Sequence, residues 1–227
     1  MPEHTPWAVI ELGIEGKGDM KDLSYKAHPD LAVLTNIGTS HMEHFENRKD
    51  LAEEKRAILS DARAGAPLFI NADDPYLLHI ALEEKANRPV YLVHMKGQGK
   101  YLRTELEEDS TLDSADWKQQ KELSRILASY DGPYTYGAFK SGTEFYAENI
   151  RKTGHGQSFD FYIKEAGQAE GTKVSTVSLK QVSLSNCQNA LFGLALTLVL
   201  GHDLKPAVEA LADLKLTSGR QEEVRLS

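Results

Sequence analysis

Three short apolar runs, separated by stretches with helical character, limit the fold of this chain more than any other feature. They are LAVLT at residues 31–35, PLFIN at 67–71 and PVYLV at 89–93. Polar and apolar residues do not alternate within them, so each run is expected to be buried on both faces, as in a parallel sheet that helices cover on both sides. Residues 76–85 supply one connecting helix. We therefore predict an α/β fold with a mostly parallel sheet flanked by helices.

The run WAVIEL at residues 7–12 precedes these three runs. It is short, apolar and rich in strand-forming residues, so we predict that it is a further strand. With it in place, Val9, Val33 and Phe69 are expected in the core of the sheet.

Residues 13–19, GIEGKGD, superficially resemble a phosphate-binding loop. That pattern requires a glycine five residues before its final Gly-Lys pair and a Ser or Thr after the lysine. Position 11 is Glu and position 18 is Gly, so the pattern fails. We expect a turn here, followed by a short helix at residues 20–26.

The second half of the chain has a different pattern. Residues 96–132 are charged and poorly periodic, which favours a solvated insertion. Between residues 133 and 184, glycine-rich turns separate alternating segments, which predicts a small antiparallel sheet beside the parallel one. Strands are expected at residues 144–150, 158–163 and 174–179, and helices at 186–200 and 204–214.

Charge and cysteine content exclude several classes of protein. The formal net charge of −8 is unfavourable for general nucleic-acid binding. A single cysteine, Cys187, cannot form an internal disulfide or a multi-cysteine zinc site, and it suits a reducing compartment. No signal peptide is recognisable, and the longest apolar run, residues 190–200, is too short to span a bilayer. We expect a soluble cytoplasmic protein that binds neither nucleic acid nor membrane.

A helix predicted from about residue 48 carries the most informative side chain. Leu51, Ile58 and Ala62 have the spacing of an apolar stripe that faces a core. Lys55 lies four residues after Leu51 and three before Ile58, so it points along that stripe. Either it is a snorkelling lysine at the edge of the stripe, or its amine has a function in a polar site.

Polar residues gather where the predicted strands end. Glu11, Asn36 and Asn71 all sit at the carboxyl ends of predicted strands, and the ligand crevice of an open α/β sheet lies outside these ends. His41 and Lys55 map to the same end. A carboxylate with few other protein ligands suits Mg²⁺, which keeps several waters and bridges to substrate phosphates. An ammonium group would repel the ion, so Lys55 fits such a site only if it is deprotonated or converted to an anion.

Several segments in a fixed order resemble the central, ATP-binding domain of the Mur ligase family, the cytoplasmic amide-forming ligases of peptidoglycan precursor synthesis. The segments are VIELGIEGKGDM, PDLAVLTNIGTSHMEHF, AEEKRAIL, FINADDP, LSNCQNALFGLALTLVLG and SGR. They extend from Val9 to Arg220. Within the family the chain most resembles the type that adds D-alanyl-D-alanine to UDP-MurNAc-tripeptide, because ELG stands at residues 11–13 and TNIGTSHMEHF at 35–45.

The resemblance implies a role for six residues. By position, Glu11 and His41 match the family's magnesium ligands, and Lys55 matches the lysine that becomes N-carbamylated and supplies the missing anion. Asn189, with Asn186 as its companion, matches the asparagines of an N-x-x-N-A-L motif that contacts adenine. Arg220 matches an arginine that contacts the nucleotide phosphates. The implied cofactors are ATP and Mg²⁺.

The family resemblance also implies a reaction. A substrate carboxylate attacks the γ-phosphate of ATP to give an acyl phosphate, and the incoming amine then displaces phosphate. UDP-MurNAc-peptide and D-Ala-D-Ala would be the partners of a monomeric enzyme. The alternatives are another family member, such as a MurE-like or folylpolyglutamate synthase-like ligase, or a non-catalytic nucleotide-binding or interaction domain.

The 227 residues contain no G-T-x-G-K-T phosphate loop, which in the family precedes the Glu11 motif. We therefore expect residues 1–227 to be a truncated central domain. Its parallel part would be residues 1–95 and 185–227, and the family's N-terminal UDP-binding and C-terminal domains would be absent. We expect the chain alone to be inactive.

Overall fold

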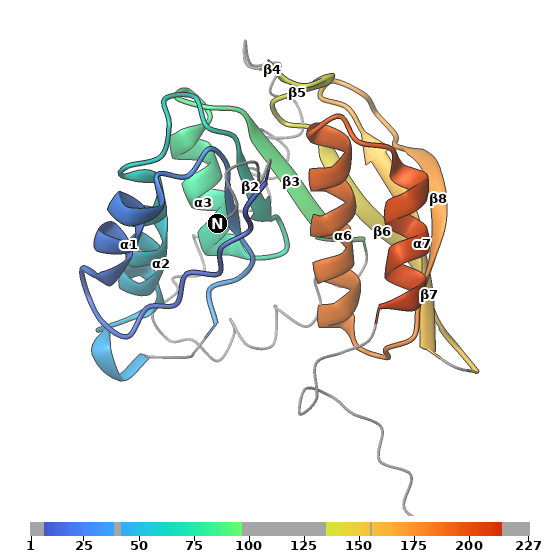
Figure 1. The fold of residues 1–227 in the computed structure, drawn as a ribbon, viewed down its shortest axis with the longest axis horizontal. Coiled ribbons are helices and arrows are strands. Elements are labelled where there is room, and N and C mark those ends of the chain that lie inside the picture. Colours follow the sequence, from blue (N-terminus) through green and yellow to red (C-terminus); the bar gives the residue numbers. More distant parts are fainter. Residues whose placement is uncertain (1–6, 39–41, 97–134, 155, 215–227) are drawn as a thin grey trace, which may run out of the picture.

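A computed structural model describes residues 7–38, 42–96, 135–154 and 156–214 of the chain. Their centre is one six-stranded sheet with the order β1-β2-β3-β6-β7-β8, beside a two-stranded hairpin of β4 and β5 (Figure 1). The strands of the large sheet are β1 (Ala32–Leu34), β2 (Leu68–Asn71), β3 (Val90–Met95), β6 (Glu144–Thr153), β7 (Gly156–Lys164) and β8 (Thr172–Leu179), and those of the hairpin are β4 (Thr135–Tyr136) and β5 (Phe139–Lys140).

The sheet has a parallel and an antiparallel half, as predicted. β1, β2, β3 and β6 pair in parallel, whereas β7 and β8 continue from β6 as an antiparallel meander. The two halves are continuous, because β6 pairs with β3 through the register Leu92↔Glu144. The antiparallel part therefore extends the parallel sheet edge to edge.

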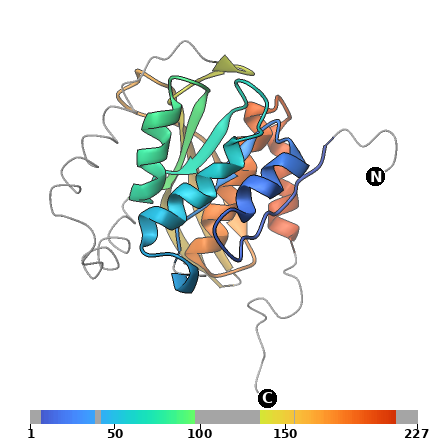
Figure 2. The same ribbon diagram turned by 90° about the vertical axis from the view of Figure 1, so that its left-hand side faces the viewer.

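Helices cover the two faces of this sheet. On one side lie α1 (Asp19–Ala27), α2 (Arg48–Arg56) and α3 (Pro75–Glu84), and on the other lie α6 (Leu184–Val199) and α7 (Leu204–Asp213) (Figures 1 and 2). Successive residues of β3 divide between two cores, with Val90 and Leu92 packing toward the first helix group, and Tyr91 and Val93 toward the second. This is why the buried strands read as continuous apolar runs.

The predicted stripe on α2 faces the core at Leu51 and Ile58, but the α-helix ends earlier than the stripe implies. Leu51 is fully buried, but the α-helix stops at Arg56 and a 3₁₀ turn, η2 (Ala57–Leu59), follows. In this turn Leu59 is buried in the core, and Ile58, which is partly buried, packs against the same core.

The strand predicted at residues 7–12 is wrong. These residues belong to no strand, Val9 is 100% exposed, and Trp7 and Ile10 are more than half exposed. A strand is stable only where a neighbour takes up its main-chain hydrogen bonds. In the described residues β1 is the end strand and pairs only with β2, so residues 7–12 have no sheet partner. The insertion predicted at residues 96–132 lies almost wholly outside the described residues.

A buried carboxylate fastens the antiparallel half. The Asp160 side chain on β7 is 5% exposed and accepts hydrogen bonds from Lys173 (2.8 Å), Thr176 (2.8 Å), Asn149 (3.0 Å) and Arg151 (3.3 Å). The hydrogen bond from Lys173, together with those from its other neighbours, holds the pKa of Asp160 well below its ordinary value.

We expect Asp160→Asn to lower the free energy of unfolding by about 1–3 kcal/mol at pH 7, because it leaves two cations without their shared anion while their own exposure limits the loss. The folded-state pKa of Asp160 is depressed, so its contribution is present above the ordinary carboxylate pKa of about 4 and declines as the pH falls below it. Urea unfolding from pH 7 to pH 3 should therefore show the stability difference between the original protein and Asp160→Asn becoming smaller toward pH 3. Asp213→Asn, at an exposed pair with Lys180, is the control and should cost less than about 1 kcal/mol. An equal loss in both variants would contradict this prediction.

Candidate functional site

Lys55 lies in the last turn of α2, beside the turn that follows β1. The helix begins where Asn47 caps it, since the Asn47 side chain accepts the Asp50 N–H at 3.0 Å. Eight residues later the half-buried Lys55 donates its Nζ to the carbonyl oxygen of Asn36 at 2.9 Å. Burial lowers the pKa of the Lys55 amine, and the nearby charge of Asp74 opposes that shift. The structure thus places Lys55 beside the turn at the carboxyl end of β1, and its role in a site stays a prediction.

Asp74 connects the same turn to α3. Its side chain is buried, accepts the Ile37 N–H at 2.7 Å through Oδ2, and caps α3 by accepting Tyr76 and Leu77 N–H through Oδ1. Burial raises the pKa of Asp74, although the backbone hydrogen bonds oppose the rise. Asp74 was not singled out from the sequence alone. An Asp immediately before Pro75 is, however, the pattern of a helix cap followed by proline at the first helical position.

Protein carboxylates already bind the amides of the loop at residues 13–19. Asp19 accepts the N–H groups of Glu15 and Gly16, at 2.9 and 2.7 Å, and these hydrogen bonds lower the pKa of Asp19. Glu54 of α2 accepts the N–H groups of Gly18 and Met20 at the start of α1, both at 2.9 Å. These amides have their acceptors within the protein, which agrees with the prediction of a turn.

The remaining predicted site residues are distributed around this centre. Glu11 is exposed in the extended segment before the loop. Asn186 and Asn189 lie in the first turns of α6, on the opposite face of the sheet from α2, with Asn189 exposed and Asn186 half-buried. His41 and Arg220 lie outside the described residues. Among the candidates that the structure describes, only Lys55 is shown in contact with the strand-end turn.

The donor groups fit Mg²⁺ in chemistry. No group of three His, Cys, Asp or Glu side chains in the described residues is arranged to hold a metal ion. A carboxylate at Glu11 and an anionic form of Lys55 would provide oxygen ligands, which Mg²⁺ prefers. Lys55 already has the lowered pKa that makes its neutral, reactive form more accessible.

None of the helices in the described ranges is long and apolar enough to cross a membrane.

Comparisons with known proteins agree on one family. The model of the Mur ligase middle domain matches residues 1–129. A UDP-N-acetylmuramoyl-tripeptide–D-alanyl-D-alanine ligase of Bacillus subtilis (strain 168) is 43% identical over 77 residues, which are 34% of this chain and 17% of that protein.

Solved structures agree in fold over nearly the whole chain. MurF from Acinetobacter baumannii superposes with a TM-score of 0.62 at 19% identity, covering 96% of this chain and 36% of that one. MurF from Thermotoga maritima, solved in complex with ADP, gives 0.58 at 19% identity over 91% of this chain and 35% of that one. The chain therefore spans about a third of these structures.

Proposed function

The chain belongs to the Mur ligase family, and on that premise we propose that it is the central domain of an ATP-dependent ligase of peptidoglycan precursor synthesis, which adds D-alanyl-D-alanine to UDP-MurNAc-tripeptide. The identity to a ligase of that name supports the choice of substrates. The observation that carries the proposal is the half-buried Lys55 amine, held on the Asn36 carbonyl at the carboxyl end of β1. Ligand crevices of α/β sheets lie at this end.

Lys55 is the residue that we propose is carbamylated. Its neutral amine nitrogen attacks the carbon of CO₂, an N–C bond forms, and a proton passes to solvent, leaving a carbamate anion. The lowered pKa of the amine favours this reaction, because only the neutral amine is nucleophilic. The anion resolves the conflict between a lysine and a cation site.

Glu11, His41 and the Lys55 carbamate would hold Mg²⁺. When bound there, the ion would neutralise charge on the transferring phosphoryl group. Asn186 and Asn189 would contact the adenine, and Arg220 the phosphates. These residues bind and orient, which is most of what phosphoryl transfer requires from a protein.

The proposed reaction has two steps. An oxygen of the tripeptide carboxylate attacks the γ-phosphorus of ATP, the bond to ADP breaks, and an acyl phosphate forms. The amine of D-Ala-D-Ala then attacks the acyl carbon, phosphate leaves, and the amine gives up a proton. The enzyme is proposed to act in the cytoplasm as a monomer, without nucleic-acid or membrane contacts, and the formal charge of −8 supports the first of these two absences.

A non-catalytic nucleotide-binding domain is the second candidate, because the 227 residues contain no G-x-x-x-x-G-K-[ST] loop. The full-length protein that carries this domain should be assayed for phosphate release from ATP. Release that requires both UDP-MurNAc-tripeptide and D-Ala-D-Ala supports the ligase. Nucleotide binding without release that depends on these substrates would support the second candidate and contradict the first.

The 227-residue chain alone is expected to bind Mg-ATP weakly and to form no peptide bond. A phosphate loop supplies the backbone amides, lysine and hydroxyl that hold the triphosphate, and this sequence lacks that set. Isothermal titration calorimetry should detect no tight binding. A submicromolar Kd would show that the domain binds nucleotide by other groups.

A further inference from the structure

Three consecutive side chains of α2 each contact a different element. Glu54 accepts two N–H groups at the start of α1, Lys55 donates to Asn36 after β1, and Arg56 binds α3. Consecutive residues of an α-helix point about 100° apart, so three neighbours can reach in three directions. The last turn of α2 is thereby fixed from three sides, with Lys55 in the middle.

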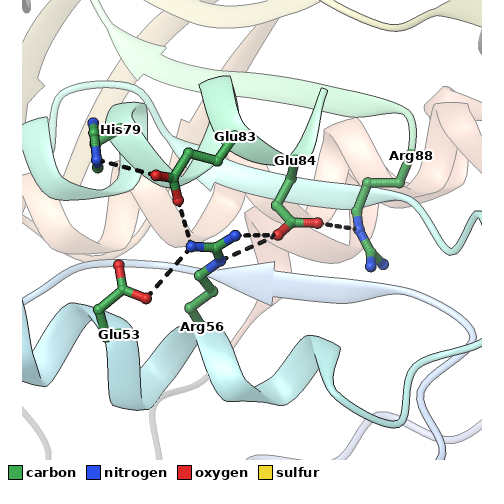
Figure 3. Close-up of polar contacts among 6 residues, drawn as sticks. All are labelled: Glu53, Arg56, His79, Glu83, Glu84 and Arg88. Atoms are coloured by element: carbon green, nitrogen blue, oxygen red, sulfur yellow. Dashed lines mark hydrogen bonds and ion pairs between the residues drawn. The ribbon is translucent and has the colours of Figure 1, made fainter. Parts of the chain in front are cut away.

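The contact between Arg56 and Glu84 is the least exposed of the ion pairs that Arg56 makes. Arg56 donates to Glu84 Oε1 from Nε at 3.1 Å and from Nη2 at 2.8 Å, and its Nη1 contacts Glu83 and Glu53 (Figure 3). The Glu84 side chain is 8% exposed, and its other oxygen accepts Arg88 Nε at 2.8 Å. Burial opposes ionisation of Glu84, but the bonds from Arg56 and Arg88 outweigh it and lower the pKa of Glu84.

The contact between Arg56 and Glu84 lies where α2 ends. Beyond Arg56 the chain winds into η2, and the Ala57 N–H is shared among the carbonyls of Glu53, Glu54 and Lys55. Shared hydrogen bonds of this kind are common at helix termini. The side chains of Glu54, Lys55 and Arg56 connect this turn to other elements of the fold.

Helix α3 contacts the chain beside both partners of the hydrogen bond between the Lys55 amine and the Asn36 carbonyl. At its first turn Asp74 holds the Ile37 N–H, next to Asn36, and at its last turn Glu84 holds Arg56, next to Lys55. A helix of 10 residues is a rigid rod of about 15 Å. The two partners of the Lys55–Asn36 hydrogen bond are thus each tied to one end of α3.

We propose that Arg56, through its ion pair with Glu84, is a positioning residue that sets the Lys55 amine at the carboxyl end of β1. The importance of Arg56 for catalysis rests on the proposed function. The effect of Arg56 on the Lys55 amine does not rest on that function, and it can be measured in the 227-residue chain. Buried ion pairs contribute little to net stability but can specify geometry, which agrees with such a role.

The first test measures access to the amine. Trace acylation at about pH 10, where a substantial fraction of ordinary lysines is neutral, gives the labelling rate of Lys55 relative to exposed Lys49 on the same helix, read by peptide mass spectrometry. In Arg56→Gln the ratio is expected to rise at least threefold, because the loosened turn releases the amine from Asn36. Arg88→Gln is the matched control, since it also removes a partner of Glu84 but does not touch α2. Its ratio should stay within 1.5-fold of the original.

Further variants keep the test decisive. Arg56→Lys retains the charge without the two-nitrogen contact and should give an intermediate ratio, and it replaces Arg56→Gln if circular dichroism shows that variant unfolded. The double variant Arg56→Gln/Glu84→Gln should give the same labelling ratio as Arg56→Gln, because each substitution removes the same contact between Arg56 and Glu84. An unchanged ratio in folded Arg56→Gln or Arg56→Lys, or an equal change in Arg88→Gln, overturns the proposal.

The second test uses the full-length enzyme. Arg56→Gln should lower kcat at least tenfold with KM nearly unchanged, whereas Arg88→Gln should lower Tm similarly and keep kcat. Equal kcat in these two variants would make Arg56 merely structural and overturn the proposal. A Lys55→Ala enzyme with full activity would instead reject the proposed role of Lys55, and the labelling ratios would still decide whether Arg56 positions that amine.

Discussion

Lys55→Ala in the full-length ligase should reduce kcat by about 10²–10³-fold, the size of effect found when one preorganised charge-stabilising group is removed. The variant removes the amine that stands beside Asn36 at the strand end, and with it the carbamate proposed as a ligand of Mg²⁺. Steady-state release of phosphate from ATP, with both amide substrates present, measures the loss.

The pattern of rescue separates a carbamate from a structural lysine. A short-chain carboxylate added to the Lys55→Ala enzyme should restore part of the activity, because it can supply the missing anion in the space left by the side chain. Bicarbonate should stimulate the unmodified enzyme but not the variant. Lys49→Ala, at an exposed position of the same helix, is the control and should keep full activity. Full activity of Lys55→Ala would leave Lys55 as a snorkelling residue at the edge of the α2 stripe.

Local signals in the sequence predicted most of the elements around this site. The buried strands β2 and β3 follow from apolar runs, and α2 follows from the spacing of its apolar residues; its start was predicted at about residue 48, where the structure has it. Interactions of this kind span a few residues, so they can be read from sequence. Asp74 before Pro75 is also a local cap, although it was not predicted as one, and its second contact, with the Ile37 N–H, is not visible in the sequence.

Long-range partners account for what sequence reasoning missed. Arg56 and Glu84 are 28 residues apart, and no periodicity indicates that they meet. Val9 is of a residue type that favours strands, yet a strand also needs a neighbouring strand, which the described residues do not offer to residues 7–12. The end of α2 was misjudged for a related reason, because the 3₁₀ turn that buries Leu59 depends on packing against the rest of the core.

The relative positions of the predicted site residues could be read from the sequence only in part, for the same physical reason. Lys55 could be placed from the helical stripe, since the stripe is local. The positions of Asn186 and Asn189 relative to Lys55 depend on which face of the sheet α6 covers, and the structure puts α6 on the face opposite α2. Their roles toward nucleotide stay proposals.

Gly156→Ala should be the most destabilising single substitution among those proposed, lowering the free energy of unfolding by about 4 kcal/mol or more. Gly156 opens β7 with φ +153°, and a Cβ built there would stand 1.9 Å from the carbonyl oxygen of Leu179 on β8. Real Cβ atoms do not approach a backbone oxygen so closely, so the two strands would have to separate. For a protein of this size the loss corresponds to a fall in Tm of roughly 8–16 °C.

The chain contains its own control for this substitution. Gly154 lies two residues earlier, has no positive φ, and a Cβ there meets no atom within 4 Å. Gly154→Ala should therefore change the free energy of unfolding by less than about 1 kcal/mol. Chemical denaturation measures the free energy of unfolding of both variants. Equal stability of Gly156→Ala and Gly154→Ala would contradict the prediction, because it would mean that β7 and β8 separate without an energetic cost. They should not, because Gln157, the next residue, donates its side-chain N–H to the Ser183 carbonyl at 2.6 Å, and Ser183 caps the helix that carries Asn186. A shift of β7 at Gly156 would therefore also displace the start of α6, where the proposed adenine contacts lie.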